Sequence, residues 1–172
     1  MFYRSPRPIT ASDYVDDFEC QSSEQTAWLI RHAKQSVAAN ITKVFVVIDD
    51  DSGTVVAYYA WTMAQLSLAD APKRLMKGAG RYAQPVALLA RLGVHKDHER
   101  RGIGAGMLRD AIVRLVLVGE QIGCRGLLIH AESTEAREFY LHLVPELVES
   151  PTDSLHLVLM LKDAEQSLRR SS

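Results

Sequence analysis

Residues 85–106 read PVALLARLGVHKDHERRGIGAG, and this stretch decides the fold. Its first ten residues form a nearly unbroken apolar run, interrupted by Arg91, which is typical of a central strand buried on both faces. A short polar loop follows, and from Ile103 onward apolar residues recur at the spacing of a long amphipathic helix. A buried strand that leads through a loop into a helix predicts a sheet covered by helices.

The residues before this stretch predict a helix and a hairpin. Ser22 and Gln25 have the spacing of a capping box, in which each side chain satisfies a backbone amide of the other residue at a helix start. Lys43 to Ile48 and Thr54 to Thr62 are rich in strand-forming residues. The turn residues 49–53 between them, DDDSG, therefore indicate an antiparallel hairpin.

The residues after the stretch predict a strand, a helix and a closing hairpin. Gly126 to Ala131 is a second buried strand, Thr134 to Leu143 a short helix, and Leu147 to Glu149 pairs with Ser154 to Leu161. The residues after Lys162 are expected to form a solvated tail. The predicted fold class is α+β, with a mixed, mostly antiparallel central sheet flanked by helices.

The length and composition fit an ordinary soluble protein. Domains usually have about 100–200 residues, so we expect one domain over residues 1–162 and a C-terminal tail over 163–172 of this 172-residue chain. A hydrophobic share of 47% and a charged share of 24% exclude a disordered or collagen-like chain. The formal net charge of −1 does not indicate a nucleic-acid partner, which must instead be sought in local basic patches.

Several other classes of protein lack support in the sequence. Cys20 and Cys124 lie far apart and match no zinc spacing, so we expect two small buried thiols and no metal site, with a disulfide between them as the alternative. Residues 1–6 lack the apolar core of a signal peptide. No run of about 18 apolar residues is present that could cross a membrane. We therefore expect a cytoplasmic protein without a membrane partner.

Glycines alternate at the start of the long helix, at Gly102, Gly104 and Gly106. Glycine leaves no Cβ over a turn, so backbone amides can approach a ligand closely, and a helix start offers unpaired N–H groups. These features predict a site for an anion, most naturally a phosphate or pyrophosphate, with Arg100 and Arg101 adding positive charge at its rim.

Two other glycine-rich motifs do not match this loop. The spacing G-x-G-x-G differs from the G-x-G-x-x-G of dinucleotide-binding folds, and the Gly-Lys-Ser/Thr of a Walker A loop is absent. A tight turn with close helix packing, and no ligand, stays open as an alternative.

Tyr140 lies in the short helix that follows the second buried strand. A phenol with a pKa near 10 can supply a proton to a thiolate of comparable basicity, which is the leaving group in acyl transfer from a thioester. The alternative is that Phe139 and Tyr140 form a core aromatic pair near a helix end.

The buried strand, the basic loop and Arg101-Gly102-Ile103-Gly104 together resemble the acyl-coenzyme A site of the GNAT acetyltransferase superfamily. The resemblance implies that loop amides hold the pyrophosphate of acetyl-CoA, that the strand bonds its pantetheine arm, and that Tyr140 is the general acid. The implied coenzyme contacts are Leu92, Gly93, Val94, Arg100, Arg101, Gly102, Ile103, Gly104, Ala105 and Gly106. The family's loop usually reads Q/R-x-x-G-x-G/A, whereas this chain has Glu99 first and then Arg100, where glycine is common.

Almost the whole chain is similar to one branch of that superfamily, the TacT-like toxins of bacterial toxin–antitoxin pairs. The matching blocks are Pro6–Thr10, Phe18–Cys20 with Trp28-Leu29, Val55–Ala60, Ala90–Val94, Arg125–Ala131 and Glu135–Leu141. The chain departs from the branch at Gln21, where glycine is usual, and at Leu143-Val144-Pro145, near the usual Gly-Phe. The resemblance implies a toxin that acetylates the amino group of aminoacyl-tRNA, blocks translation, and has a ribbon-helix-helix antitoxin.

The sequence says less about how the implied reaction binds the acceptor tRNA and removes the proton of its amine. Pro85 to Val94 contains no carboxylate to act as a base, but the amine of an aminoacyl ester is less basic than lysine and needs little help. Phosphates attract basic patches, and a solvated surface is the alternative. The candidate RNA contacts are Lys73, Arg74, Lys77, Arg81 and Arg91, with Lys34 a weaker one. Surplus apolar residues in the helix from Ile103 to Val118 indicate an oligomer surface, consistent with a homodimer.

We therefore expect an acetyl-CoA-dependent N-acetyltransferase toxin that acts on aminoacyl-tRNA. Two alternatives stay open. One is a GNAT N-acetyltransferase for a small-molecule or protein amine, with the same coenzyme site. The other is a non-enzymatic module that binds acyl-CoA.

Overall fold

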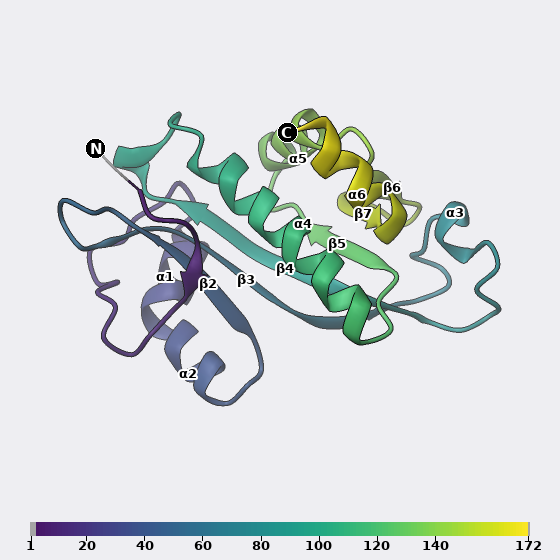
Figure 1. Cartoon of the computed structure of the whole chain (residues 1–172), viewed down its shortest axis with the longest axis horizontal. Helices are drawn as coiled ribbons and strands as arrows, with labels where there is room; N and C mark the ends of the chain where they lie inside the picture. Colours follow the sequence, from purple (N-terminus) through teal and green to yellow (C-terminus); the bar gives the residue numbers. More distant parts are fainter. Residues whose placement is uncertain (1–2, 172) are drawn as a thin grey trace. The chain divides into compact units, whose positions relative to one another are not determined.

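Among residues 3–171, which the computed structural model describes, seven strands form one sheet in the order β1-β2-β3-β4-β5-β7-β6 (Figure 1). The strands are β1 (Arg7–Pro8), β2 (Lys43–Ile48), β3 (Val55–Leu66), β4 (Gln84–Val94), β5 (Gly126–His130), β6 (Val148–Ser150) and β7 (Asp153–Met160). Strands β4 and β5 pair in parallel, whereas β1–β2, β2–β3, β5–β7 and β6–β7 are antiparallel. The predicted mixed, mostly antiparallel sheet is confirmed.

Six α-helices and one 3-10 turn connect these strands in the described part of the chain. They are α1 (Ser23–Arg31), α2 (Ala33–Ala38), α3 (Lys73–Met76), the 3-10 turn η1 (Lys96–His98), α4 (Ile103–Gln121), α5 (Thr134–Leu143) and α6 (Leu161–Arg170). Within residues 3–171, no helix is both long enough and apolar enough to cross a bilayer.

The chain divides into two compact units. The first unit contains the residues up to Thr62 together with Ala90–Asp110, and the second contains Met63–Leu89 and the residues from Ala111 onward. Whether residues 1–162 behave as the single predicted domain, with 163–172 as a separate tail, stays a prediction.

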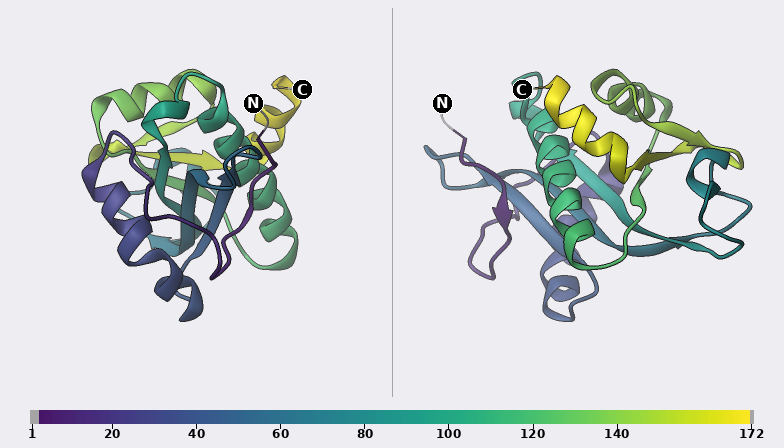
Figure 2. Two further views of the ribbon diagram at one scale, coloured as in Figure 1. Left: turned by 90° about the vertical axis from the view of Figure 1, so that its left-hand side faces the viewer. Right: turned by 45° about the vertical axis from the view of Figure 1, so that its right-hand side comes forward.

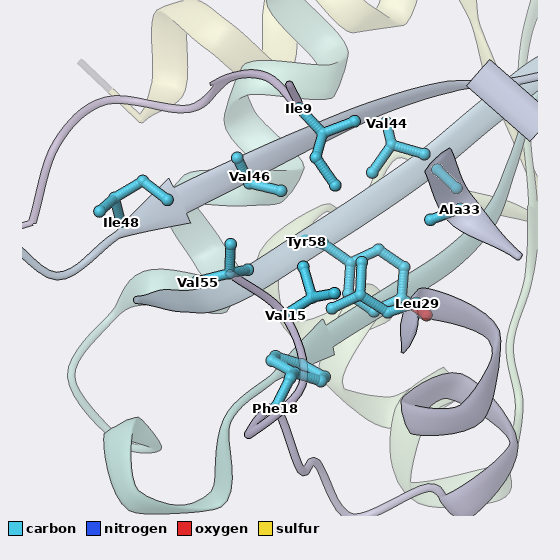
Figure 3. Close-up of a cluster of buried hydrophobic side chains, with 11 residues drawn as sticks. Ile9, Val15, Phe18, Leu29, Ala33, Val44, Val46, Ile48, Val55 and Tyr58 are labelled. Carbon is cyan, nitrogen blue, oxygen red and sulfur yellow. The ribbon is translucent and has the colours of Figure 1, made fainter. Parts of the chain in front are cut away.

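The core of the first unit lies on one face of β2 and β3. Alternate residues of β2 point to this face because successive strand side chains project to opposite sides. They meet side chains from the N-terminal segment and from α1 (Figure 3). The core residues are Ile9, Val15, Phe18, Leu29, Ala33, Val44, Val46, Ile48, Val55, Tyr58 and Ala60. On the other face, the Phe45 and Tyr59 rings stack 5.0 Å apart, and Tyr59 donates a 2.6 Å hydrogen bond to Asp110 of α4.

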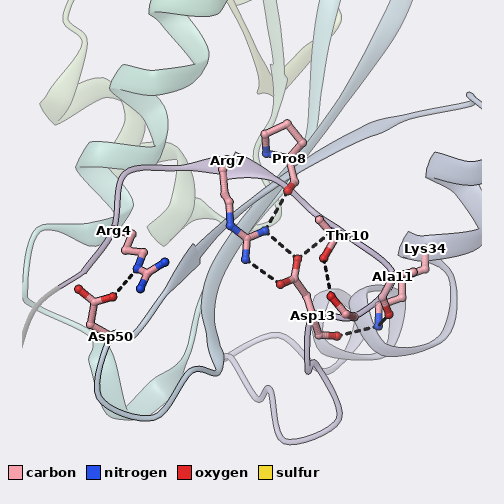
Figure 4. A network of polar contacts seen from close by, with 9 residues as sticks. Arg4, Arg7, Pro8, Thr10, Ala11, Asp13, Lys34 and Asp50 are labelled. Carbon is pink, nitrogen blue, oxygen red and sulfur yellow. Dashed lines mark hydrogen bonds and ion pairs between the residues drawn. The ribbon is translucent and has the colours of Figure 1, made fainter.

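A group of charged and polar residues fixes the N-terminal segment; we call Arg7, Thr10, Asp13 and Lys34 the N-terminal clamp (Figure 4). The Arg7 guanidinium donates two hydrogen bonds, of 2.8 and 2.7 Å, to the Asp13 carboxylate, which also accepts one of 2.7 Å from the Thr10 amide. Lys34 donates to the backbone carbonyl of Asp13 at 2.7 Å. The bond from Arg7 is the largest of the causes that lower the pKa of Asp13 to about 2.

Replacing Asp13 with asparagine should therefore lower the free energy of unfolding by about 1–2 kcal/mol at pH 7, after allowance for the partly exposed Arg7. The folded-state pKa is depressed, so this stabilisation is present above the ordinary carboxyl pKa and is lost as the pH falls toward about 2. Urea unfolding of both proteins at pH 7 and pH 3 measures the difference, which should shrink at the lower pH. Asp50→Asn, at the more exposed ion pair with Arg4, is the matched control. Equal stability of Asp13→Asn and the parent at pH 7 would contradict the assignment.

The second unit has its own apolar cluster between the sheet and the segment that contains α3. The cluster consists of Leu66, Ala71, Leu75, Val86, Leu128, Val158 and Met160. Strand β5 passes very close to β7, because a Cβ built on Gly126 would lie 2.2 Å from the carbonyl oxygen of Leu159. Only glycine fits at this position of the β5–β7 pair.

Most predicted elements agree with the structure, but β3 continues to Leu66, beyond the predicted end at Thr62, and the C-terminus differs. The sequence predicts a solvated tail after Lys162, whereas Leu161–Arg170 form α6, which contacts β5 and β7 (Figure 2). Asp163, Ala164 and Ser167 are buried on this helix, and Arg74 binds Asp163 through two hydrogen bonds of 2.7 and 3.2 Å. The sequence pattern does not predict this helix because α6 has many polar residues and its buried face is short and partly polar.

Candidate functional site

The loop between β4 and α4 has an unusual backbone. Arg100 and Gly102 have positive φ angles of 61° and 80°, and α4 begins directly afterwards at Ile103. Left- and right-handed residues in alternation turn successive N–H groups toward one side and form a concave anion site. The left-handed conformation at Arg100 also explains why glycine is common at this position of the resembling family's loop.

Open space lies next to this loop. A Cβ built on Gly102 or on Gly106 would have no atom within 4 Å, so a ligand can approach the backbone there. A cavity of about 200 Å³ adjoins the loop. It is lined by Tyr3, Arg4, Pro6, Val47, Arg101, Gly102, Ile103 and Gly106. The predicted anion site therefore has both exposed backbone and positive charge at its edge.

The end of β4, where the predicted coenzyme contacts Leu92, Gly93 and Val94 lie, is tightly packed in the same unit. A Cβ on Gly93 would lie 3.2 Å from the Cys20 sulfur and 3.4 Å from the Tyr58 ring, so a side chain has little room there. The His95 amide donates to the Val56 carbonyl at 2.8 Å, which fixes the chain as it leaves the strand. Cys20 and Cys124 are both free thiols, as predicted.

The two departures from the family patterns near the loop contact each other. Gln21 donates a hydrogen bond of 3.4 Å to the carboxylate of Glu99. The acid at the first loop position therefore has a polar partner on the N-terminal segment. Neither Gln21 nor Glu99 alone predicts this contact, since they are 78 positions apart.

Arg91, a candidate RNA contact, has several protein partners. Its guanidinium donates to the side-chain oxygen of Gln25 at 2.9 Å and lies 5.0 Å from the centre of the Trp28 ring. It also approaches Glu24 at 3.5 Å. The predicted capping box is half confirmed, because the Ser22 hydroxyl accepts from the Gln25 amide at 3.1 Å, while the Gln25 side chain binds Arg91 instead of closing the box.

Tyr140 belongs to the second unit, where it is the buried residue of α5. The helix starts as its sequence predicts, because the Ser133 hydroxyl caps the Ala136 amide at 3.1 Å. Tyr140 is 6% exposed, so its side chain is almost completely buried. Burial, together with the nearby charge of Glu132, raises the pKa of the Tyr140 phenol above its ordinary value of 10. This phenol keeps its proton at neutral pH and can donate it to a bound group.

The basic segment Lys73–Arg81 also lies in the second unit. Lys73, Lys77 and Arg81 are exposed, and Tyr82 is 78% exposed. Arg74 differs from them because it is bound to Asp163. The stretch is free of acids in the sequence, yet folding brings an acid to one of its four cations. Lys34, the weaker candidate, donates hydrogen bonds to the backbone carbonyls of Ala11 and Asp13.

A histidine pair in the second unit was not predicted. His130 at the end of β5 faces His156 on β7, and their rings stack 3.9 Å apart. Burial and the neighbouring His156 lower the pKa of His130. Among the described residues, no group of three or more histidine, cysteine, aspartate or glutamate side chains is placed to hold a metal ion.

Comparison with known proteins adds three findings. A profile of the acetyltransferase (GNAT) family matches residues 8–143. The chain is 39% identical over 162 residues to the tRNA-acetylating toxin of Mycobacterium tuberculosis, which covers 94% of this chain and 95% of that protein. Among solved structures, AtaT complexed with acetyl-methionyl-tRNAfMet superposes with a TM-score of 0.85 at 19% identity, over 94% of this chain and 97% of that one.

A second solved structure carries other ligands on the same fold. It is a tyrosine-to-phenylalanine mutant of the toxin AtaT bound to the C-terminus of the antitoxin AtaR and acetyl-CoA. It superposes with a TM-score of 0.80 at 17% identity and covers 96% of this chain and 97% of that chain.

Proposed function

The chain belongs to the acetyltransferase (GNAT) family, and from this premise we propose that it transfers the acetyl group of acetyl-CoA to the amino group of aminoacyl-tRNA and so blocks translation. The observation that carries the proposal is the 39% identity with a tRNA-acetylating toxin over almost the full length of both chains. Two features support the proposal. The left-handed glycine loop offers backbone amides for the pyrophosphate of the coenzyme, and the buried Tyr140 offers a phenol as proton donor.

The residues around the loop fit the coenzyme. Exposed amides at the start of α4 bind the pyrophosphate, because a helix start favours negative charge and no side chain covers Gly102 or Gly106. The backbone of Leu92, Gly93 and Val94 bonds the pantetheine arm. Bound acetyl-CoA supplies an acetyl group activated as a thioester.

Tyr140 assists the departure of the sulfur. In the transfer, the amine nitrogen forms a bond to the acetyl carbon, the carbon–sulfur bond breaks, and the nitrogen loses a proton. Tyr140 donates a hydrogen bond or its proton to the sulfur as the thiolate forms. Burial raises the pKa of this phenol, which favours donation of a hydrogen bond by the neutral form. No carboxylate lies on β4 to accept the amine proton, so the amine enters uncharged or releases its proton to water.

The partners follow from the same proposal. Lys73, Lys77 and Arg81 contact tRNA phosphates from the exposed basic segment, while Arg74 and Arg91 contact RNA only if their protein partners release them. The antitoxin is a ribbon-helix-helix protein, the toxin works as a homodimer, and the complex acts in the cytoplasm. These assignments rest on likeness to the toxin branch.

The experiment that tests the function is mass spectrometry of total charged tRNA after incubation with the protein and acetyl-CoA. We expect the aminoacyl group of at least one tRNA to gain the mass of C2H2O, which is the net change when an acetyl group replaces an amine hydrogen. Rising salt should weaken the reaction steeply, because tRNA binding releases counterions.

Two parallel incubations separate the proposal from its alternatives. One contains peptides and polyamines in place of tRNA, and the other contains uncharged tRNA. Acetylation of peptides or polyamines but not of charged tRNA would replace the proposed acceptor. Binding of acetyl-CoA without transfer to any amine would favour a module that only binds the coenzyme.

A further inference from the structure

A chain of hydrogen bonds links the N-terminal segment to the coenzyme loop. Arg101 donates a 2.8 Å hydrogen bond from Nη1 to the hydroxyl oxygen of Tyr3. The same hydroxyl lies 2.8 Å from Nδ1 of His98, and the two rings meet edge to face at 5.7 Å. We call Arg101, Tyr3 and His98 the relay.

The two hydrogen bonds of the relay are donated in one direction, from Arg101 to Tyr3 and from Tyr3 to His98. A guanidinium can only donate, so the Tyr3 oxygen is an acceptor toward Arg101. Its own proton can then be given to His98 when that imidazole is neutral. Burial, followed by the positive charge of Arg101, lowers the pKa of His98, which agrees with a neutral ring.

The backbone holds Tyr3 in this position. Tyr3 forms a β-bridge with Asp49 beyond the end of β2, and the Arg4 amide donates to the Ile48 carbonyl at 3.3 Å. Arg4 also forms an ion pair with Asp50. The N-terminal clamp secures the same segment further along (Figure 4). The Tyr3 hydroxyl is therefore presented to Arg101 by a segment that is attached at several points.

The cavity beside the loop indicates which kind of ligand group Arg101 can bind. Arg101 and Arg4 both line it, together with the bare backbone at Gly102 and Gly106. Because Arg4 is paired with Asp50, the phosphate-binding role in this cavity falls to the Arg101 guanidinium, and arginine binds phosphate with charge-assisted hydrogen bonds. The amides of the loop account for the pyrophosphate of the coenzyme, and coenzyme A carries one more phosphate, at the 3′ position of its ribose.

We propose that Arg101 binds the 3′-phosphate of acetyl-CoA and that Tyr3, backed by His98, is a positioning residue that aims it. The proposal rests on the proposed function for the identity of the ligand. It assigns to the N-terminal segment a part in coenzyme selection, namely discrimination between acetyl-CoA and the analogue that lacks this phosphate.

The test compares acetyl-CoA with acetyl-dephospho-CoA by calorimetric Kd and by KM and kcat. We expect the parent protein to bind acetyl-CoA about tenfold more tightly, in line with one charged hydrogen-bond partner. Tyr3→Phe keeps the ring and removes the hydroxyl. It should raise Kd and KM for acetyl-CoA about three- to fivefold, leave kcat unchanged, and barely affect acetyl-dephospho-CoA. Arg101→Gln should abolish the preference. Tyr14→Phe, at an exposed tyrosine outside the relay, should match the parent.

Several results would overturn the inference. A parent protein that binds both coenzymes equally, or a Tyr3→Phe variant that loses affinity for both by the same factor, would leave the relay with a structural role only. If Tyr3→Phe unfolds at a lower temperature, the Arg101→Lys variant replaces it as the test. Lysine keeps the positive charge but lacks the planar guanidinium that Tyr3 is proposed to position. If this variant still discriminates between acetyl-CoA and acetyl-dephospho-CoA as the parent does, the proposal is rejected. Tight binding of acetyl-CoA without acetylation of charged tRNA would remove the proposed acceptor and leave this inference standing.

Discussion

Tyr140→Phe lowers kcat for acetyl transfer at least tenfold, and by about 100-fold if the phenol transfers a full proton, since general-acid assistance is typically worth about 10²–10⁴-fold. The Kd for acetyl-CoA should stay within about twofold of the parent value, because the substitution removes one oxygen and keeps the buried ring. Stability should change little, since phenylalanine keeps the ring that Tyr140 buries. Stopped-time assays with charged tRNA, together with calorimetry, measure the two quantities separately.

The pH dependence provides a second check on this role. A phenol whose pKa is raised stays protonated through the neutral and mildly alkaline range, so Tyr140 should cause no loss of kcat below its ordinary pKa of 10. Tyr14→Phe serves as the control for a tyrosine hydroxyl outside the site. A Tyr140→Phe protein with the parent's kcat would remove the residue from the reaction.

Gly102→Val raises the Kd for acetyl-CoA at least tenfold, and by about 100-fold if the loop loses its left-handed turn. The residue has a φ of 80°, which a β-branched side chain strongly disfavours. The new Cβ and its methyl groups would also occupy the open space beside the backbone, where the pyrophosphate is proposed to bind. Calorimetry with acetyl-CoA measures the change.

A matched variant separates backbone strain from loss of the anion site. Gly53→Val places the same side chain at a φ of 71° with open space around it, in the turn between β2 and β3. Both variants should lose similar stability, but only Gly102→Val should lose coenzyme affinity. Equal loss of affinity in both would mean that general destabilisation, and not the loop, controls binding.

Local sequence patterns predict most of the fold. The strand-forming residues of β2 and β3, the turn between them and the Ser133 cap of α5 all act over a few residues, so the sequence locates those elements closely. Helix α6 was missed because its buried positions, Asp163 and Ser167 among them, include polar residues that a local pattern places in solvent.

The sequence predicts those parts of the site that depend on local backbone conformation. It does not predict contacts between residues that lie far apart in the chain. Glycine spacing identifies the loop after β4, and the positive φ of Gly102 agrees with it. The partners of Arg91, Arg74 and Glu99 lie 66, 89 and 78 positions away, so no local pattern could identify them. For the same reason nothing in the sequence singles out Tyr3.

Arginine at a left-handed position has an evolutionary consequence. The backbone at Arg100 is held in a conformation that disfavours any residue with a Cβ by roughly 1–2 kcal/mol. Glycine and arginine codons can differ by a single base, so one point mutation exchanges a relaxed loop for an additional cation beside the coenzyme site. A substitution between arginine and glycine at this position would therefore change the backbone strain and the charge of the loop together.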